Sequence, residues 1–230
     1  EKSNFVVHTF VRKNSIDQLA ALISDTDFVV HLAGENRPKD HNDFKKVNTD
    51  FTKNLCEALI TEKEKTGRKV SLILASSMQA IQDNPYGLSK AEAESIVLNY
   101  SKTTNTSCYI YRLPNVFGKW CRPNYNSVIA TFCNNIANKL PININNHGTK
   151  LSLVYIDDVC DSFINLLNND VSSGYKSVTP VYKTTVGEVA ELLYKFEKSN
   201  RWGDIPFINK AVQISKPLTT AFIGLNEGYR

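Results

Sequence analysis

Short apolar runs of strand length alternate along this chain with longer segments of helical periodicity. The clearest runs are Asp27–Leu32, Val70–Ser76 and Ser107–Arg112, in which apolar residues occupy consecutive positions. Strands of this kind are buried on both faces, as in a parallel sheet covered by helices. The alternation therefore predicts an α/β fold: a Rossmann-like doubly wound parallel sheet with right-handed crossovers and ligands at the carboxyl ends of the strands.

The same patterns predict the remaining elements and two regions. Further strands are expected at Asn4–Val11, Pro141–Asn145 and Lys150–Tyr155. Helices are expected at Ile16–Ile23 (capped by Ser15), Asp43–Glu64, Tyr86–Tyr100, Ser127–Asn138, Asp158–Leu167 (capped by Asp157) and Val186–Ser199. Leu113–Asn126 is expected to be a loop, and residues 200–230 are expected to be irregular. We expect a dinucleotide-binding region at residues 1–125 and a small substrate-binding subdomain with a tail at 126–230.

Charge and composition argue against several classes of partner. The net charge of +4 is spread without Lys/Arg blocks, so it does not indicate a nucleic-acid partner. The apolar runs are too short to span a membrane. The five cysteines form no C-x-x-C, and the four scattered histidines form no metal-ligand pattern. These features favour a cytoplasmic protein with reduced thiols and no metal.

The segment N-P-Y-G-L-S-K places Tyr86 and Lys90 four residues apart, on one face of a predicted helix. A lysine ammonium beside a phenol lowers the tyrosine pKa from about 10, so that the pair can act as a general acid or base on an alcohol or ketone oxygen. With twenty lysines and ten tyrosines in the chain, roughly one such pair is expected by chance. The second pair, Tyr194 and Lys198, is predicted to be solvated helix surface.

Context separates Tyr86 from Tyr194. Tyr86 begins a helix directly after the loop that follows a strand ending in Ala75-Ser76-Ser77. A serine hydroxyl at the carboxyl end of that strand can lie beside the tyrosine hydroxyl. We therefore predict Ser77, Tyr86 and Lys90 as catalytic residues; the alternative, that the serines only end the strand and Tyr86 only begins the helix, stays open on these grounds.

Six motifs in order resemble the extended short-chain dehydrogenase/reductase family, in its branch that modifies nucleotide sugars. They are His31-Leu32-Ala33-Gly34, Asn48 in V-N-T-D-F-T-K-N-L-C-E-A, Ser76-Ser77, Tyr86 with Lys90, Arg112–Gly118 and Tyr155–Val159. N-P-Y-G-L-S-K and F-G-K-W-C-R-P-N-Y-N-S-V-I-A-T-F-C further resemble the capsular-polysaccharide reductases. Those enzymes use NADPH to reduce the C4 ketone of a UDP-linked 4-keto-6-deoxy-N-acetylhexosamine.

The resemblance implies a role for each matching residue. Tyr86 would protonate the C4 oxygen, Lys90 would lower the Tyr86 pKa and bind the nicotinamide ribose, and Ser77 would hydrogen-bond the reacting oxygen. The implied cofactor-binding residues are Leu32, Ala33, Gly34, Asn48, Ser76, Tyr86 and Lys90. The implied contacts to the UDP-sugar are Asn115, Lys119, Arg122 and Asn126. The family also implies a homodimer packed through the helices at 43–64 and 86–100.

The first predicted strand of this chain resembles the second strand of the family, and the residues at its end indicate which cofactor is bound. An acid at the end of the second strand of a Rossmann fold binds the ribose 2′-hydroxyl of NAD, whereas an arginine there accommodates the 2′-phosphate of NADP. The strand Asn4–Val11 continues into Arg12 and Lys13 without an acid. Because a guanidinium pairs well with phosphate, we predict NADP(H), with Arg12 as the main determinant.

The chain departs from the family in two respects. It contains no G-x-x-G-x-x-G loop and begins at what resembles the family's second strand, and no segment resembles the carboxyl-terminal cupin domain of the capsular reductases. Residues 1–230 alone are therefore expected to bind NADPH weakly or not at all, and to be poorly soluble unless a partner segment covers the gap. Two other functions stay open: a sugar-nucleotide epimerase, and a non-catalytic dinucleotide-binding or scaffold member of the same fold. Dehydration is disfavoured because Met78-Gln79 follows Ser77 where dehydratases commonly place an acidic pair.

Overall fold

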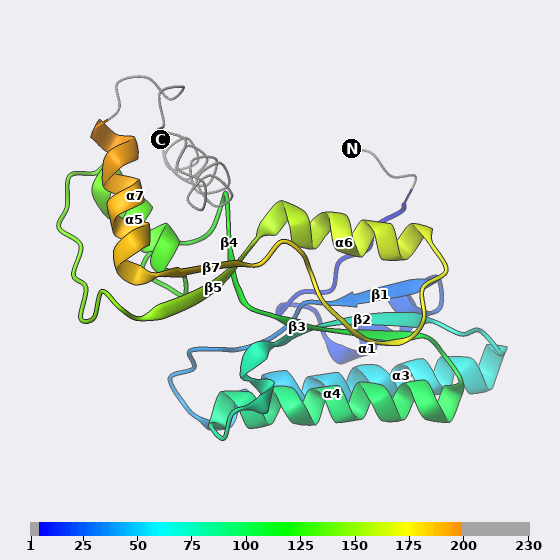
Figure 1. Ribbon diagram of the computed structural model, residues 1–230. Helices are drawn as coiled ribbons and strands as arrows, with labels where there is room; N and C mark the ends of the chain where they lie inside the picture. The colour runs from blue at the N-terminus through cyan, green and yellow to red at the C-terminus, as the bar shows by residue number, and fades with distance from the viewer. Residues whose placement is uncertain (1–4, 199–230) are drawn as a thin grey trace. The chain divides into compact units, whose positions relative to one another are not determined.

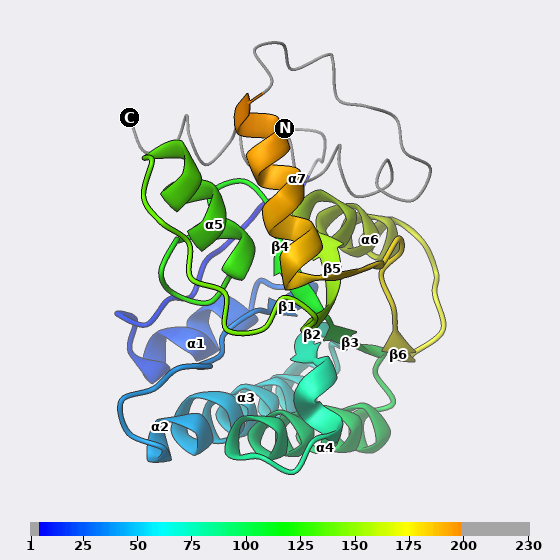
Figure 2. The same cartoon turned by 60° about the vertical axis from the view of Figure 1, so that its left-hand side comes forward.

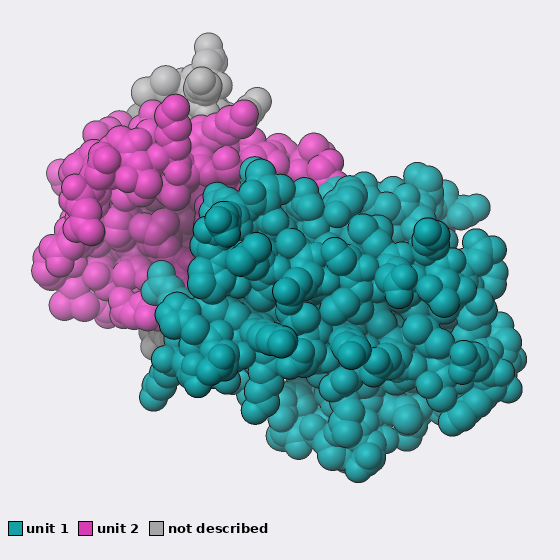
Figure 3. All heavy atoms as spheres, turned by 90° about the horizontal axis from the view of Figure 1, so that it is seen from below, with its two compact units in different colours: residues 1–112, 170–176 teal, residues 113–169, 177–230 magenta. Residues whose placement is uncertain are grey.

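The computed structural model describes residues 5–198 (Figure 1). They divide between two compact units, each with its own sheet: unit 1 (residues 1–112 and 170–176) and unit 2 (residues 113–169 and 177–230) (Figure 3). The segment 170–176 thus returns to unit 1 and adds a strand to its sheet. The assignment of 1–125 to dinucleotide binding and 126–230 to substrate binding stays a prediction.

Unit 1 contains a four-stranded sheet in the order β1-β2-β3-β6, in which β1 pairs with β2 and β3 with β6 in parallel. Its strands are β1 Phe28–His31, β2 Ser71–Ser77, β3 Cys108–Leu113 and β6 Gly174–Lys176. Its helices are α1 Ile16–Ile23, α2 Asn42–Phe44, the π-helix Lys45–Asp50, α3 Phe51–Thr66, the 3₁₀ turn Met78–Ile81 and α4 Pro85–Thr104. The predicted parallel α/β sheet with flanking helices is confirmed.

One face of the unit 1 sheet is covered by α3 and α4, which lie side by side (Figures 1 and 2). Leu59 of α3, Val97 of α4 and Leu72 of β2 are each almost fully buried in one apolar cluster. Tyr100 of α4 also reaches the sheet, and its hydroxyl donates to the carbonyl of Val70 at 2.7 Å. This packing holds the later turns of α4 against the amino end of β2, so the helix runs antiparallel to the strand and begins near its carboxyl end.

Residues 5–11 form no strand, so the strand predicted at Asn4–Val11 is wrong for the part that the structure describes. The β-branched and aromatic residues suit an extended segment, but a strand also needs a neighbour that pairs with its backbone groups. None of the described strands pairs with this segment. Phe10 stacks on Phe51 with the ring centroids 5.7 Å apart, whereas Val6 and Val7 are 83% and 76% exposed.

Unit 2 contains a three-stranded sheet in the order β4-β5-β7, with β4 parallel and β7 antiparallel to β5. Its strands are β4 Asn115–Phe117, β5 Lys150–Tyr155 and β7 Tyr182–Thr185, and its helices are α5 Val128–Ala137, α6 Ile156–Asn168 and α7 Val186–Lys198. Phe117, Ile129, Leu153 and Leu193 meet in its core.

Several predicted elements of unit 2 need correction. The expected loop at 113–126 contains β4, and the short strand expected at Pro141–Asn145 is irregular because no described strand pairs with it. Asp157 is not the N-cap of α6: Tyr155 holds that position, and Asp157 lies in the first turn, where its carboxylate pairs with Lys119 at 3.1 Å. The segment 200–230, predicted to be irregular, lies outside the described residues.

All five cysteines are free thiols. Within residues 5–198, no helix is both long and apolar enough to cross a membrane.

Candidate active site

The sequence N-P-Y-G determines how α4 begins. Asn84 caps the helix, because its side-chain oxygen accepts a hydrogen bond from the backbone N–H of Gly87 at 2.8 Å, and Pro85 occupies the first turn. A Cβ atom on Gly87 would lie only 2.3 and 2.5 Å from two backbone carbonyl oxygens of the preceding turn. Glycine therefore lets the helix start pack closely on that turn, and this places Tyr86 at the carboxyl end of β2.

Ser77 and Tyr86 meet at this end of β2. The Ser77 oxygen accepts a hydrogen bond from the backbone N–H of Gln79 at 3.1 Å, which fixes its side chain at the start of the turn before α4. Burial raises the pKa of the half-buried Tyr86, and the nearby Ser77 hydroxyl only partly offsets this effect. Burial and Ser77 account for the shift in the Tyr86 pKa, and the expected lowering of this pKa by Lys90 stays a prediction. Tyr86 is protonated at neutral pH and is suited to donate a proton.

Lys90 lies one turn further along α4 and is only 5% exposed. Its ammonium donates to the carbonyl of Ala75 on β2 at 3.0 Å. Burial lowers the pKa of Lys90 to about 8, against a smaller raising effect of Glu94. A Cβ atom on Gly34 would lie 3.2 Å from Lys90 Nζ and 3.3 Å from Asn48 Oδ1. The structure thus brings Gly34, Asn48 and Lys90 together, as the motifs predict for cofactor-binding residues.

Asn48 connects the loop after β1 to α4. It lies in the π-helix Lys45–Asp50 and is 1% exposed. Its side-chain oxygen accepts from the N–H of Glu35 at 2.7 Å, and its Nδ2 donates to the carbonyl of Glu35 and the hydroxyl of Ser89, both at 2.9 Å. Ser89 in turn donates to the carbonyl of Tyr86 at 2.8 Å. π-helical turns are frequent at functional sites, and here one directs an amide toward α4.

His31, at the end of β1, is 3% exposed, and its Nε2 lies 2.8 Å from the Thr52 hydroxyl oxygen. The single hydroxyl proton of Thr52 is donated to the carbonyl of Asn48 at 2.6 Å, so the imidazole N–H must be the donor to Thr52. Burial, together with the charge of Lys90, lowers the pKa of His31 to about 4. His31 is therefore neutral at physiological pH and supports the π-helix.

Sequence reasoning missed Glu94, which lies one turn beyond Lys90 and is 2% exposed. Ser76 donates its hydroxyl to this carboxylate, Arg112 binds it through Nε at 3.0 Å and Nη2 at 2.6 Å, and the Tyr175 hydroxyl lies 3.1 Å from Oε2. The K-x-x-x-E spacing and the arginine of R-x-x-N were the available signals. The hydroxyl of Ser76 is thus engaged with Glu94, and its contact with a cofactor stays a prediction.

The other predicted cofactor residues are exposed. Arg12 is 81% exposed at its side chain and pairs with Glu35, with Nη2 3.1 Å from Oε2. Lys13 lies in the turn beside it. Leu32, which is 66% exposed, and Ala33 follow β1 in the loop that leads to Gly34.

The predicted substrate contacts all lie in unit 2: Asn115, Lys119, Arg122 and Asn126. Asn115 donates to a β5 carbonyl at 3.1 Å. Lys119 pairs with Asp157 at 3.1 Å, and the Arg122 guanidinium lies 5.9 Å from the ring centre of Tyr125. Asn126 is exposed, in the loop before α5.

Comparison with known proteins identifies the family. The model of the NAD dependent epimerase/dehydratase family matches residues 4–178. The chain belongs to the NAD dependent epimerase/dehydratase family. The resemblance drawn from the six motifs is thereby confirmed.

Two relatives within this family are especially informative. The chain is 45% identical over 202 residues to a UDP-2-acetamido-2,6-beta-L-arabino-hexul-4-ose reductase of Pseudomonas aeruginosa, covering 87% of this chain and 53% of the relative. The crystal structure of the capsular polysaccharide assembling protein CapF from Staphylococcus aureus matches with a TM-score of 0.79 and 36% identity, covering 93% of this chain and 57% of CapF. The chain thus spans little more than half the length of each.

A more distant match supports the fold of this epimerase/dehydratase chain. The UDP-glucuronic acid 4-epimerase from Bacillus cereus in complex with NAD has a TM-score of 0.76 and 18% identity, covering 95% of this chain and 81% of the epimerase. At that level of identity the likeness concerns the fold alone.

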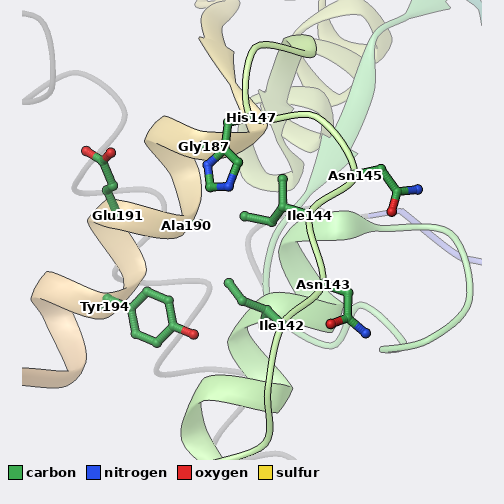
Figure 4. A pocket seen from close by; sticks show the side chains of 9 residues that line it. All are labelled: Ile142, Asn143, Ile144, Asn145, His147, Gly187, Ala190, Glu191 and Tyr194. Carbon is green, nitrogen blue, oxygen red and sulfur yellow. The ribbon is translucent and has the colours of Figure 1, made fainter.

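A cavity of about 690 Å³ lies in unit 2 of this family member, between α7 and the segment that follows α5 (Figure 4). The side chains of Ile142 and Ile144 point toward α7, whereas those of Asn143 and Asn145 point away (Figure 4). Its lining is formed by Ile142, Asn143, Ile144, Asn145, His147, Gly187, Ala190, Glu191 and Tyr194. None of the predicted site residues lines this cavity.

Proposed function

We propose that this chain carries out the NADPH-dependent reduction of the C4 ketone of a UDP-linked 4-keto-6-deoxy-N-acetylhexosamine. The convergence of Ser77, Tyr86 and Lys90 at the carboxyl end of β2 carries this proposal. The printed activity of the Pseudomonas relative supports the reaction. The likeness to CapF supports a place in the synthesis of a capsular or surface polysaccharide precursor. We also propose that the protein is cytoplasmic.

Reduction of a ketone requires a hydride at carbon and a proton at oxygen. NADPH, when bound, supplies the hydride to C4. Tyr86 donates its phenol proton to the C4 oxygen, and Ser77 donates a hydrogen bond to the same oxygen. The product is the C4 alcohol, and Tyr86 is left as a phenolate. The neighbouring Lys90 ammonium stabilises that phenolate, because an opposite charge nearby favours the ionised form.

The residues present fit the nicotinamide-ribose end of such a cofactor. Gly34 has no Cβ atom, so the space beside its backbone, next to Lys90 and Asn48, is left unfilled. A ribose can therefore lie against this backbone. Lys90 would bind the ribose hydroxyls, and the remaining predicted contacts follow from the same loop and strand end: Leu32, Ala33, Asn48 and Ser76. Arg12, with Lys13 beside it, would bind the 2′-phosphate in place of its partner Glu35.

The UDP-sugar would be held by unit 2 residues. A diphosphate is a strong partner for cationic side chains, so we assign it to Lys119 and Arg122. Phosphate oxygens would then compete with the carboxylate of Asp157 for the Lys119 ammonium. Asn115 and Asn126 would contact the sugar. We also propose a homodimer packed through α3 and α4.

The test is a turnover assay on the purified protein with the 4-keto sugar nucleotide and either NADPH or NADH. We expect one C4 alcohol formed per nicotinamide oxidised, with NADPH preferred. Arg12→Ala should reduce that preference by about tenfold, since a charge-assisted bond is worth roughly 1.5–3 kcal/mol. If the assay yields an epimerised sugar without net oxidation of the cofactor, the protein is an epimerase and the proposed reduction is wrong. Dinucleotide binding without turnover would favour the non-catalytic alternative.

A further inference from the structure

Strand β2 and helix α4 are joined at two consecutive points. Ala75 accepts a hydrogen bond from the Lys90 ammonium, and the next residue, Ser76, donates its hydroxyl to Glu94. Lys90 and Glu94 lie one helical turn apart, where side chains four residues apart are neighbours. Both are buried, at 5% and 2% exposure. The Lys90 ammonium therefore has the buried carboxylate of Glu94 as a neighbour on the same helix.

We propose that Glu94 is a positioning residue for the catalytic pair: its fixed carboxylate holds the charge of the Lys90 ammonium at the carboxyl end of β2. This inference rests on the proposed function, because it assigns to Lys90 the support of Tyr86. Glu94 itself does not reach the reacting atoms in this scheme.

The carboxylate of Glu94 is held from three strands. Ser76 on β2 donates to it, Arg112 on β3 binds both of its oxygens, and the Tyr175 hydroxyl on β6 lies 3.1 Å from it. The Arg112 guanidinium also lies 4.6 Å from the centre of the Tyr175 ring. Burying a carboxylate is costly unless it is paired and hydrogen-bonded, and these partners fix the position of the Glu94 carboxylate.

The charges around Lys90 have opposing effects on its pKa. Burial lowers that pKa, and Glu94 raises it. From β1, His31 faces Lys90 as a neutral group, and on α4 the protonated Tyr86 lies one turn before it. Arg112 partly neutralises Glu94 through their bidentate ion pair. Glu94 and Arg112 should therefore act on the Lys90 pKa with opposite signs.

This opposition separates an electrostatic role from a merely structural one. In protein with ¹³C-labelled lysine, the Cε resonance of Lys90 is identified by its loss in Lys90→Met and is followed over pH. Glu94→Gln should lower the Lys90 pKa by about one unit, the lower end of the range for a neighbouring charge. Arg112→Gln should raise it, and its side chain is 36% exposed, so this variant does not open the core.

Glu62→Gln is the matched control, because it removes a carboxylate of α3 that pairs with Arg68 just after the end of that helix, and it does not affect the partners of Lys90. It should leave the Lys90 pKa unchanged. Shifts of the same sign in Glu94→Gln and Arg112→Gln, or no shift in either, would overturn the proposal.

The resonance is measured without turnover, so a failure of this proposal and a failure of the proposed function can be distinguished. When the variants are also assayed, the basic limb of kcat/KM should move with the Lys90 pKa. A pKa that moves while the limb does not would contradict the catalytic role of Lys90 and leave the Glu94–Lys90 coupling intact.

Discussion

Tyr86–Lys90 at the start of α4 and Tyr194–Lys198 at the end of α7 share one spacing but differ in surroundings. Lys90 is 5% exposed and bonded to the carbonyl of Ala75, and Tyr86 is half-buried against Ser77. Tyr194 is 39% exposed, and Lys198 is exposed in the last turn of its helix. The spacing is therefore uninformative by itself, and it is the adjoining strand end that distinguishes the two pairs.

The two helices also place their lysines for different reasons. A lysine in the last turn of a helix interacts favourably with the negative end of the helix dipole, which suffices to account for Lys198. Lys90 lies in the second turn of α4, where the dipole gives no such benefit and burial lowers its pKa to about 8. Its position is explained instead by the carbonyl of Ala75 and the carboxylate of Glu94.

The largest effect should come from exchanging the tyrosines of the two pairs for phenylalanine. Tyr86→Phe removes the proposed proton donor and should reduce kcat by at least about 10²-fold, the usual contribution of a positioned acid. The KM for the sugar nucleotide should change little, because the ring and its packing remain. Tyr194→Phe should leave both constants unchanged. Steady-state kinetics of the two variants check this, and equal losses would remove the distinction between the pairs.

The buried surroundings of Lys90 can be tested through His31. Its pKa is lowered from 6.5 to about 4 by burial, with a contribution from Lys90. The unfolded chain therefore binds a proton that the folded protein does not between these pH values, and stability rises with pH across that window. The contribution is complete above pH 6.5 and is lost as the pH falls to about 4, amounting to about 3 kcal/mol.

His31→Gln should flatten this part of the pH dependence, because glutamine can still donate to Thr52 but does not titrate. Urea unfolding at several pH values within the window measures the slope. His147→Gln, at an exposed position in unit 2, is the matched control and should keep the wild-type slope. A wild-type slope in His31→Gln would mean that another group produces it.

The parallel fold and the Tyr86–Lys90 site follow from local sequence signals. Apolar runs of strand length predicted β1, β2 and β3. The segment N-P-Y-G indicated where α4 begins, and in the structure this helix start packs on the preceding turn. Periodicity between residues 43 and 64 predicted one helix, and the structure divides this segment into α2, a π-helix and α3. The widened turn arises from tertiary bonds of Asn48 to Glu35 and Ser89, which no local pattern contains.

Local sequence patterns could not predict which segments far apart in the chain pair with one another. Residues 5–11 have the β-branched and aromatic composition of a strand and no described strand to pair with. Strand β6 has only three residues and forms because it pairs with β3, whose partner residues lie 65 positions earlier in the chain. Glu94 was missed for a similar reason. Its role depends on Arg112 and Tyr175, which the fold brings to it from two other strands.

The smallest expected effect concerns the open backbone beside the buried pair. Gly34→Ala places a Cβ atom 3.2 Å from Lys90 Nζ and 3.3 Å from Asn48 Oδ1. The end of the lysine can yield by a few tenths of an ångström, so unfolding stability should change little. The methyl group would nevertheless occupy the surface against which we place the ribose, and NADPH should bind about tenfold more weakly, a loss of about 1.4 kcal/mol. Gly148→Ala is the control, because its Cβ would make an ordinary 3.4 Å contact with Asn146 in unit 2. Calorimetric titration compares the two, and an unchanged affinity in Gly34→Ala would move the proposed ribose position away from Lys90.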